Sequence, residues 1–223
     1  MNHIVSRSMI ALLVCALSTG VAVAHSHSHH KQKSSSHHFD YYLMSLSWSP
    51  SYCATHPHDA IQCGHPGFGF VLHGLWPENR NGSWPQHCDT HAAPDETTIK
   101  RTLAFMPSRR LIEHEWQTHG SCTGLDPSAY FAQADRAFAS VRIPAVLHAP
   151  RKPPDLSANE LIRAFLQTNP GLGKNMISVA CRDGNELTEV RVCLNKDTLS
   201  PQACTGRIRN TCRIGSLRIR AVQ

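Results

Sequence analysis

The chain has no long apolar run beyond its first 24 residues, so a protein with several membrane spans is excluded. It also lacks internal repeats, which excludes repeat architectures. Only 17% of its residues are charged but 41% are hydrophobic, so a wholly disordered chain is excluded. Acidic residues are fewer than basic ones, 16 against 22, and this mild basic bias is compatible with a polyanionic partner. The 223 residues suffice for one sizeable globular domain.

The N-terminus has the pattern of a secretory signal peptide. Arg7 precedes the apolar run of residues 9–17, and Ala22 and Ala24 flank Val23 in a small-x-small cleavage site. This pattern predicts that residues 1–24 form a signal peptide that is cleaved after Ala24. The mature protein is then expected to be exported, to the periplasm or the extracellular medium, without membrane attachment.

Cysteine usage indicates the same kind of compartment. Of nine cysteines, Cys15 lies in the predicted signal peptide, which leaves eight in the mature chain. An even number of cysteines in an exported chain predicts four disulfides in an oxidising environment. The count alone leaves the pairing open.

Residues 25–38 contain six histidines together with Ser, Lys and Gln, and they include no apolar residue. A segment without apolar periodicity is predicted to be disordered. Because imidazoles bind Zn, Cu or Ni, one interpretation is a metal-collecting tail. The other, which so unspecific a composition favours, is a solvated linker that binds metal only adventitiously.

Apolar patterns predict strands at both ends of the remaining chain and helices in its middle. The strands are expected at residues 39–48, 68–73, 176–182, 187–194 and 216–222, and the helices at residues 95–104, 108–119, 127–141 and 158–168. Two helix starts have clear signatures, Asp126 before Pro127 and a capping box of Ser157 with Glu160. This order predicts an α+β fold for residues 39–223, a single disulfide-stabilised domain with a largely antiparallel central sheet and several packed helices.

A first candidate for chemistry is His73, which ends an apolar strand and is followed by Gly74. The junction between a rigid strand and a loop is a usual place for catalytic groups. Taken alone, a packed structural histidine explains this position equally well.

A second candidate is the helix at residues 108–119. At about 100° per residue, Glu115 and His119 fall in the same arc as Leu111, Ile112 and Trp116. Burying a carboxylate and an imidazole is costly unless they pair or line a cleft. The helix therefore predicts either a catalytic cleft or a satisfied core pair.

The same helix superficially resembles a zinc metalloprotease motif, because a His-Glu pair is followed by another histidine. His114 and His119 are five residues apart, however, so they diverge by about 140° around the helix. They cannot bind one ion from one helical face, and we predict no metal site in the folded domain.

Together these segments resemble the ribonuclease T2 family. The family's His-Gly-Leu-Trp-Pro run is present at residues 73–77. Its His-Glu-Trp-x-Lys-His-Gly-Thr-Cys run is present at residues 114–122, with Thr118 in place of the lysine and Ser121 in place of the threonine. Shorter matching stretches occur at residues 39–42, 48–53, 84–85 and 177–181, so the resemblance extends from residue 39 to the C-terminus.

The resemblance implies a metal-independent, cofactor-free endoribonuclease that cleaves single-stranded RNA through a 2′,3′-cyclic phosphate, acts as a monomer and has low base specificity. By the family's pattern His119 is the general base and His73 the general acid. Glu115 supports the transition state, and His114 binds phosphate. Two histidines suit this chemistry because an imidazole titrates near neutral pH and can give or take a proton there.

The family's pattern also extends to base contacts and crosslinks. Trp76 and Glu78 match positions that contact the base, and an indole with a carboxylate suits a splayed single-stranded base. The implied disulfides are Cys53–Cys63, Cys88–Cys122, Cys181–Cys212 and Cys193–Cys204.

Two other classes stay open from the sequence. One is a secreted metal- or polyanion-binding protein on an inactive nuclease fold, with the His-rich segment as its working part. Retention of His73, Glu115 and His119 disfavours this interpretation, because an inactive relative is expected to have lost at least one of them. The other class is a phosphodiesterase that acts on small nucleotides rather than on polymers.

Overall fold

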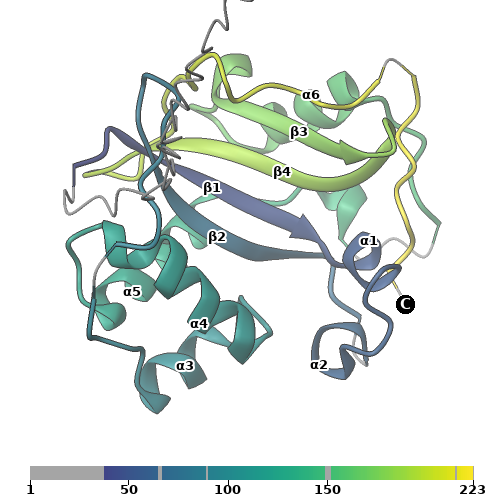
Figure 1. The fold of residues 1–223 in the computed structure, drawn as a ribbon. Helices are drawn as coiled ribbons and strands as arrows, with labels where there is room; N and C mark the ends of the chain where they lie inside the picture. The colour runs from purple at the N-terminus through teal and green to yellow at the C-terminus, as the bar shows by residue number, and fades with distance from the viewer. Residues whose placement is uncertain (1–37, 65–66, 89, 149–151, 214, 223) are drawn as a thin grey trace, which may run out of the picture. The chain divides into compact units, whose positions relative to one another are not determined.

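The computed structural model describes residues 38–64, 67–88, 90–148, 152–213 and 215–222. The predicted signal peptide and, apart from His38, the His-rich segment lie outside the described residues. The strands form an antiparallel sheet in the order β2-β1-β4-β3 (Figure 1). Their bounds are Tyr41–Trp48 for β1, Phe70–Glu78 for β2, Ile177–Arg182 for β3 and Glu186–Asn195 for β4. The predicted α+β class with a largely antiparallel sheet is confirmed.

Strand β1 is central, with β2 along one edge and β4 along the other. Its side chains are buried on both faces of the sheet. Successive side chains of a strand point to opposite faces of the sheet. The even-numbered residues from 42 to 48 enter the main hydrophobic core, which also receives Leu161 and Phe165 of a later helix. Tyr41 and Leu43 point to the other face, where they contact Cys193 of β4. This second face is where the polar side chains gather.

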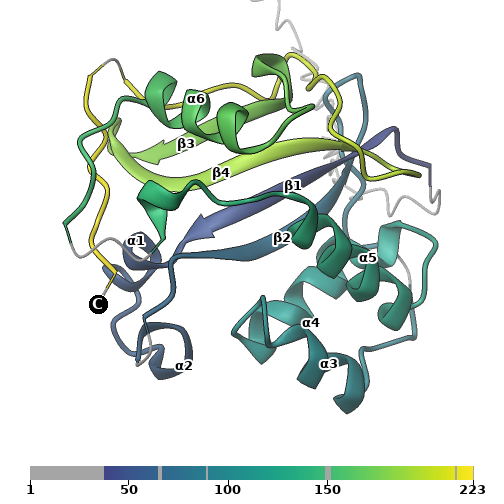
Figure 2. The ribbon, with the colours of Figure 1, turned by 180° about the vertical axis from the view of Figure 1, so that it is seen from behind.

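The longer helices occupy two places around the sheet. Helices α3, α4 and α5 lie together beside β2, whereas α6 packs on β3, behind the sheet in Figure 1 and in front of it in Figure 2. Their bounds are Glu96–Thr102 for α3, Arg109–Thr118 for α4, Pro127–Ser140 for α5 and Ala158–Thr168 for α6. Two shorter helices precede them in the chain, α1 at Ser49–Cys53 and α2 at Ala60–Cys63. Turns of 3-10 helix lie at Gly120–Cys122, Ala145–Leu147 and Lys174–Met176.

All the predicted helices are present, with ends within two residues of the expected ones. Each begins at a side chain that accepts a hydrogen bond from the backbone N–H three residues later. These capping residues are Asp95, Ser108, Asp126 and Ser157. The predicted capping box is present as well, because the Glu160 carboxylate accepts from the Ser157 backbone N–H at 2.8 Å.

Strand β2 extends beyond its predicted end at His73 by five residues. In its pairing with β1, Ser45 lies opposite Gly74 while Leu46 lies opposite Leu72. His73 is therefore the extra residue of a β-bulge. The sequence prediction stopped there because the bulge interrupts the regular alternation of the apolar residues.

The strand predicted at residues 216–222 is wrong. In the described part of this segment, isolated bridges join Ser216 to Ser157 and Arg218 to Glu186, and no ladder forms. Strand β4 already pairs with β1 along one edge and with β3 along the other. The pairing with β1 starts only at Glu189, so just the first residues of β4 have a free edge, which is too short for a ladder. There the Leu187 N–H donates to the Arg218 carbonyl at 3.2 Å, and the Arg218 N–H donates to the Asn185 carbonyl at 2.8 Å.

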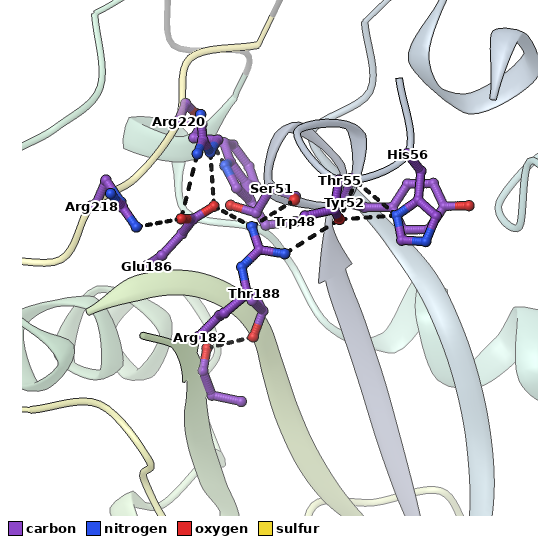
Figure 3. A network of polar contacts seen from close by, with 11 residues as sticks. Trp48, Ser51, Tyr52, Thr55, His56, Arg182, Glu186, Thr188, Arg218 and Arg220 are labelled. Atoms are coloured by element: carbon purple, nitrogen blue, oxygen red, sulfur yellow. Dashed lines mark hydrogen bonds and ion pairs between the residues drawn. The ribbon is translucent and has the colours of Figure 1, made fainter. Parts of the chain in front are cut away.

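Side-chain contacts also hold the C-terminal segment (Figure 3). Arg218 and Arg220 bind the buried carboxylate of Glu186 at 2.6 and 2.8 Å, and Arg182 binds it at 2.6 Å. The Trp48 indole N–H donates to the Arg220 carbonyl at 3.0 Å. The hydrogen bond from Arg220, with that from Arg182, lowers the pKa of Glu186 to about 2 against the effect of burial. The segment is therefore fastened to the end of β1 and the start of β4.

Among the described residues, eight cysteines form four disulfides. The pairs are Cys53–Cys63, Cys88–Cys122, Cys181–Cys212 and Cys193–Cys204, which is the pairing that the resemblance implies. The second of these pairs crosslinks the turn that follows α4. No helix in the described ranges has both the length and the apolar composition needed to cross a membrane.

We predict that replacing Cys88 and Cys122 together by serine lowers the free energy of unfolding by about 2–4 kcal/mol, because the crosslink closes a separation of 34 residues in the unfolded chain. Removing Cys53–Cys63, with a separation of 10, is expected to cost less. Urea unfolding monitored by circular dichroism measures both changes. An unaltered free energy in the Cys88/Cys122 variant would contradict this account.

Candidate active site

The bulge in β2 places His73 and Trp76 on the face of the sheet that is turned away from the main core. Their ring centroids lie 5.1 Å apart in an edge-to-face arrangement. Across β1, Glu189 and Arg191 of β4 lie opposite Ser47 and Ser45, on the same face. The two strands on either side of β1 thus bring an imidazole, an indole, a carboxylate and a guanidinium together.

Helix α4 packs its C-terminal half against this group through Gly74. The Trp76 indole N–H donates to Glu115 Oε2 at 2.7 Å, directly over the glycine. A Cβ atom at position 74 would overlap both atoms of that hydrogen bond and come within 2.9 Å of Glu115 Cδ. The glycine is therefore required by close approach, and it sets the distance between the strand and the helix.

Glu115 is only 1% exposed, and it lies one turn before His119, as the helical periodicity predicts. The next residue, Trp116, anchors the helix because its indole N–H donates to the Ala92 carbonyl at 2.7 Å. Burial raises the pKa of Glu115 to about 7, although the charge of His73 and the indole hydrogen bond oppose the shift. This carboxyl group therefore gains and loses its proton near neutral pH.

His119 caps the C-terminus of α4, where the backbone leaves the helical conformation. Its ring centroid lies 5.4 Å from that of Trp76, so the indole is close to both imidazoles. Its Nδ1 is buried and has no hydrogen-bond partner among the described residues. Burial, followed by the neighbouring charges of His114 and His73, lowers the pKa of His119 to about 3. The ring is neutral across the acidic and neutral range.

His73 has the opposite electrostatic environment. Its Nδ1 lies 2.7 Å from Glu189 Oε1, and its Nε2 lies 3.7 Å from Glu115 Oε1. Burial alone would lower the pKa of His73, but the hydrogen bond with Glu189 and the charges of both carboxylates raise it above its ordinary value. His73 thus retains its proton where His119 has none.

His114 and Thr118 form the neighbouring strip of α4, as predicted. His114 is exposed, and its Nδ1 lies 3.5 Å from the Thr118 hydroxyl. Desolvation and the charge of His73 lower the pKa of His114, and Arg110, one turn earlier, adds a smaller effect in the same direction. The charge of Arg110 therefore reaches the strip on which the family has a lysine.

Two cavities open beside these side chains. One, of about 320 Å³, is lined by Leu43, Trp76, Glu78, Trp84, His119, Arg191, Arg207 and Ile208. The other, of about 120 Å³, is lined by Ser47, Tyr52, Gln62, Val71, His73, Ser108 and Leu111. The first of these cavities contacts His119, and the second contacts His73. Larger cavities elsewhere on the chain contain neither of them.

The larger of these two cavities holds both residues that the resemblance assigns to base contact, but Glu78 already has a partner. Both of its carboxylate oxygens accept hydrogen bonds from Arg207, at 2.8 and 2.7 Å. The Arg207 guanidinium in turn stacks on the exposed Trp84 ring at 3.9 Å. Burial raises the pKa of Glu78 even though Arg207 opposes the shift. The cavity therefore presents cations and indoles more than it presents a bare carboxylate.

Sequence reasoning found the residues on β2 and α4 and missed their partners on β4 and beyond. Glu189 and Arg191 alternate with apolar residues in the predicted strand at 187–194, and two charges on one face of a buried strand are a usable signal. Arg207 and Trp84 have no comparable local pattern. In the described part of the chain, no three His, Cys, Asp or Glu side chains are arranged to hold a metal ion.

The site is of an acid–base type, with two imidazoles in opposite electrostatic environments and a buried carboxyl group between strand and helix. The family model of the ribonuclease T2 family matches residues 39–204, and the chain belongs to this family. This confirms the resemblance seen in the two sequence motifs.

Similar proteins include bacterial and plant members. A ribonuclease of Aeromonas hydrophila is 48% identical over 87 residues, which cover 39% of each chain. A probable ribonuclease of Haemophilus influenzae is 34% identical over 173 residues, 70% of this chain and 58% of that protein. The chain thus spans well under two thirds of the length of these two relatives.

Solved structures share the fold. An RNase-related protein from Calystegia sepium has a TM-score of 0.66 at 22% identity, covering 83% of this chain and 98% of that one. RNase NT in complex with 5′-AMP has a TM-score of 0.62 at 25% identity, covering 82% and 99% of the two chains.

We predict that Gly74→Ala lowers the free energy of unfolding by about 1–3 kcal/mol, because the added methyl group meets buried atoms of Trp76 and Glu115 that have no room to move. Gly206→Ala is the matched control, since a Cβ there meets no atom within 4 Å. Urea unfolding of both variants measures the difference. Equal stability of the two variants would show that the strand and the helix can separate at no cost.

Proposed function

We propose that this protein is a metal-independent endoribonuclease that cleaves single-stranded RNA by transesterification through a 2′,3′-cyclic phosphate. The observation that supports this most is the opposite effect of the protein on the two imidazoles that lie close to Trp76. The pKa of His73 is raised and that of His119 is lowered to about 3, so one ring holds a proton while the other can accept one. General acid–base catalysis requires such a pair.

In the proposed reaction, His119 removes the proton of the ribose 2′-OH. The 2′ oxygen attacks the phosphorus atom, and the bond from phosphorus to the 5′ oxygen of the next nucleotide breaks. His73 gives its Nε2 proton to that leaving oxygen, and a 2′,3′-cyclic phosphate is formed. No metal, cofactor or external reductant takes part in these steps.

Glu115 and His114 serve the phosphate in this scheme. With a pKa of about 7, Glu115 is protonated in the acidic range and donates a hydrogen bond as negative charge builds up on the phosphate oxygens. His114 is exposed on the neighbouring strip of α4, and in this scheme it contacts the same group. Both roles correspond to the family's pattern on the two motifs.

The larger cavity, beside His119, accepts the base of the nucleotide whose 2′-OH attacks the phosphorus atom. The indoles of Trp76 and Trp84 offer stacking surfaces, and every base has a π face. Stacking discriminates weakly between bases, which supports low base specificity. RNA as the substrate agrees with the names of the relatives and with the nucleotide bound in the RNase NT structure.

The N-terminal segments complete the proposal. Residues 1–24 direct export, residues 25–38 form a linker, and residues 39–223 form the catalytic domain, which acts as a monomer in the periplasm or outside the cell. The disulfides support an oxidising compartment. A polyanion-binding protein on an inactive fold would need none of the opposed proton affinities at His73 and His119.

The test of the proposed function is incubation of the purified protein with single-stranded RNA, single-stranded DNA and cyclic dinucleotides in EDTA. We expect cleavage of RNA with release of 2′,3′-cyclic phosphate ends and no cleavage of DNA, because DNA lacks the attacking hydroxyl. Cleavage of DNA at a similar rate, or loss of RNA cleavage in EDTA, would refute the proposal. Hydrolysis of cyclic dinucleotides alone would favour the small-nucleotide phosphodiesterase.

The pH dependence of kcat/KM is expected to be bell-shaped. Activity should fall on the acidic side only as pH approaches about 3, where His119 gains a proton. It should fall on the alkaline side as Glu115, with a pKa of about 7, and His73, with a pKa above the ordinary histidine value, lose the protons that they donate. His73→Ala and His119→Ala should each lose about 10²–10⁴-fold. A flat profile with active single variants would contradict the assignment.

Thr118, in place of the family's lysine, gives a further prediction. A lysine there would add a fixed charge near the phosphate, and Arg110 on the same strip supplies a weaker substitute. We expect Thr118→Lys to fold and to be at least as active. Arg110→Ala should cost more in the natural background than in Thr118→Lys, which a double-mutant cycle measures. Arg109→Ala, whose side chain binds Glu96, is the control. Additive effects would exclude Arg110 from the mechanism.

A further inference from the structure

Two carboxylates face His73, and they contact different nitrogens of its ring. Glu189 Oε1 lies 2.7 Å from Nδ1, within hydrogen-bond distance. Glu115 Oε1 lies 3.7 Å from Nε2, which is too far for a good hydrogen bond. Glu189 is therefore the direct partner of the ring, and Nε2 is the nitrogen left for a substrate.

The Glu189 carboxylate is itself held in place. It is 9% exposed, on β4 between β1 and β3. Its second oxygen accepts hydrogen bonds from Nε and Nη2 of Arg191 at 2.7 and 2.5 Å. The Arg191 guanidinium also lies over the Trp76 ring, at 5.8 Å from its centroid. The chain of contacts from Arg191 through Glu189 to His73 thus crosses the sheet face from β4 to β2.

Glu189 and Glu115 differ in the pH range over which their carboxylates stay charged. Burial raises the pKa of Glu189, but the hydrogen bond with His73 and the charge of Arg191 outweigh it and lower the pKa to about 2. The pKa of Glu115 is raised to about 7, so its charge is lost in the acidic range. Of the other ionisable groups near His73, the charge of Arg191 lowers the pKa of the ring, and His114 and His119 on α4 carry no negative charge that would raise it.

We propose that Glu189 is a positioning residue for His73: it accepts the Nδ1 proton and so fixes the ring with a protonated Nε2 directed at the leaving 5′ oxygen. Arg191 orients the carboxylate and occupies its other oxygen. This inference rests on the proposed function, in which His73 is the general acid. A second carbonyl or carboxylate partner that fixes ring tautomer and orientation is a recurrent device for catalytic histidines.

The test compares two substrates that differ in their need for a proton. A dinucleoside monophosphate expels a 5′ alkoxide, which needs the acid, whereas a nucleoside 3′-(4-nitrophenyl phosphate) expels a phenolate, which does not. Glu189→Gln should lower kcat for the dinucleoside at least about tenfold. The loss should stay smaller than that of His73→Ala, which is expected to be about 10²–10⁴-fold. It should leave kcat for the nitrophenyl substrate nearly unchanged.

A matched control is Glu186→Gln. Glu186 lies on the same strand, is also buried and binds arginines, but it has no hydrogen bond or ion pair with His73. Both variants lose a buried ion pair and should be destabilised alike in urea unfolding. Only Glu189→Gln should move the alkaline limb of kcat/KM to lower pH, because removing the carboxylate lowers the pKa of His73. NMR titration of the His73 ring measures this shift directly.

Equal losses on both substrates, or an unmoved alkaline limb, would overturn the proposal and leave Glu189 with a structural role. If Glu189→Gln does not fold, Glu189→Asp keeps the charge at a greater distance and should show the same substrate dependence in smaller measure. His73→Ala separates the two levels of inference. If it is insensitive to the leaving group, the proposed acid is wrong. If His73→Ala is sensitive to the leaving group and Glu189→Gln is not, only the role of Glu189 is wrong.

Discussion

The bulge in β2 is the constraint on which the rest of the site depends. In a regular strand, residues three apart point to opposite faces, so His73 and Trp76 would be separated by the sheet. The extra residue brings both rings to the face that carries Glu189. Leu72 and Leu75 can then both stay in the main core. The strand thus completes its packing and presents two functional rings without a loop.

Arginine contacts decide the charge of the buried carboxylates around this face. Among the described residues, the buried glutamates are Glu78, Glu115, Glu186 and Glu189. All but Glu115 bind an arginine. An unpaired carboxylate in an apolar setting favours its neutral form. Glu115 is therefore the buried glutamate best suited to exchange a proton near neutral pH, and the indole N–H of Trp76 is its hydrogen-bond donor.

Much of the fold and part of the site could be predicted from local sequence. Capping residues such as Ser108 and Asp126 mark helix starts, and the helical period placed Glu115 one turn from His119. Glu189 could not be assigned to His73, because the two are 116 positions apart and meet only through the register of β4 on β1 and the bulge in β2. Residues 216–222 have strand periodicity, but periodicity does not reveal whether an open sheet edge exists.

Two disulfides hold segments that line the larger cavity beside His119. Cys88–Cys122 closes the turn that follows His119, and Cys193–Cys204 ties to β4 the loop whose Arg207 occupies Glu78. Both walls of the larger cavity therefore depend on covalent bonds that the reducing interior of a cell does not allow. A chain that has not yet been oxidised lacks these braces. The order of both walls of the cavity therefore depends on the redox state of the protein's surroundings.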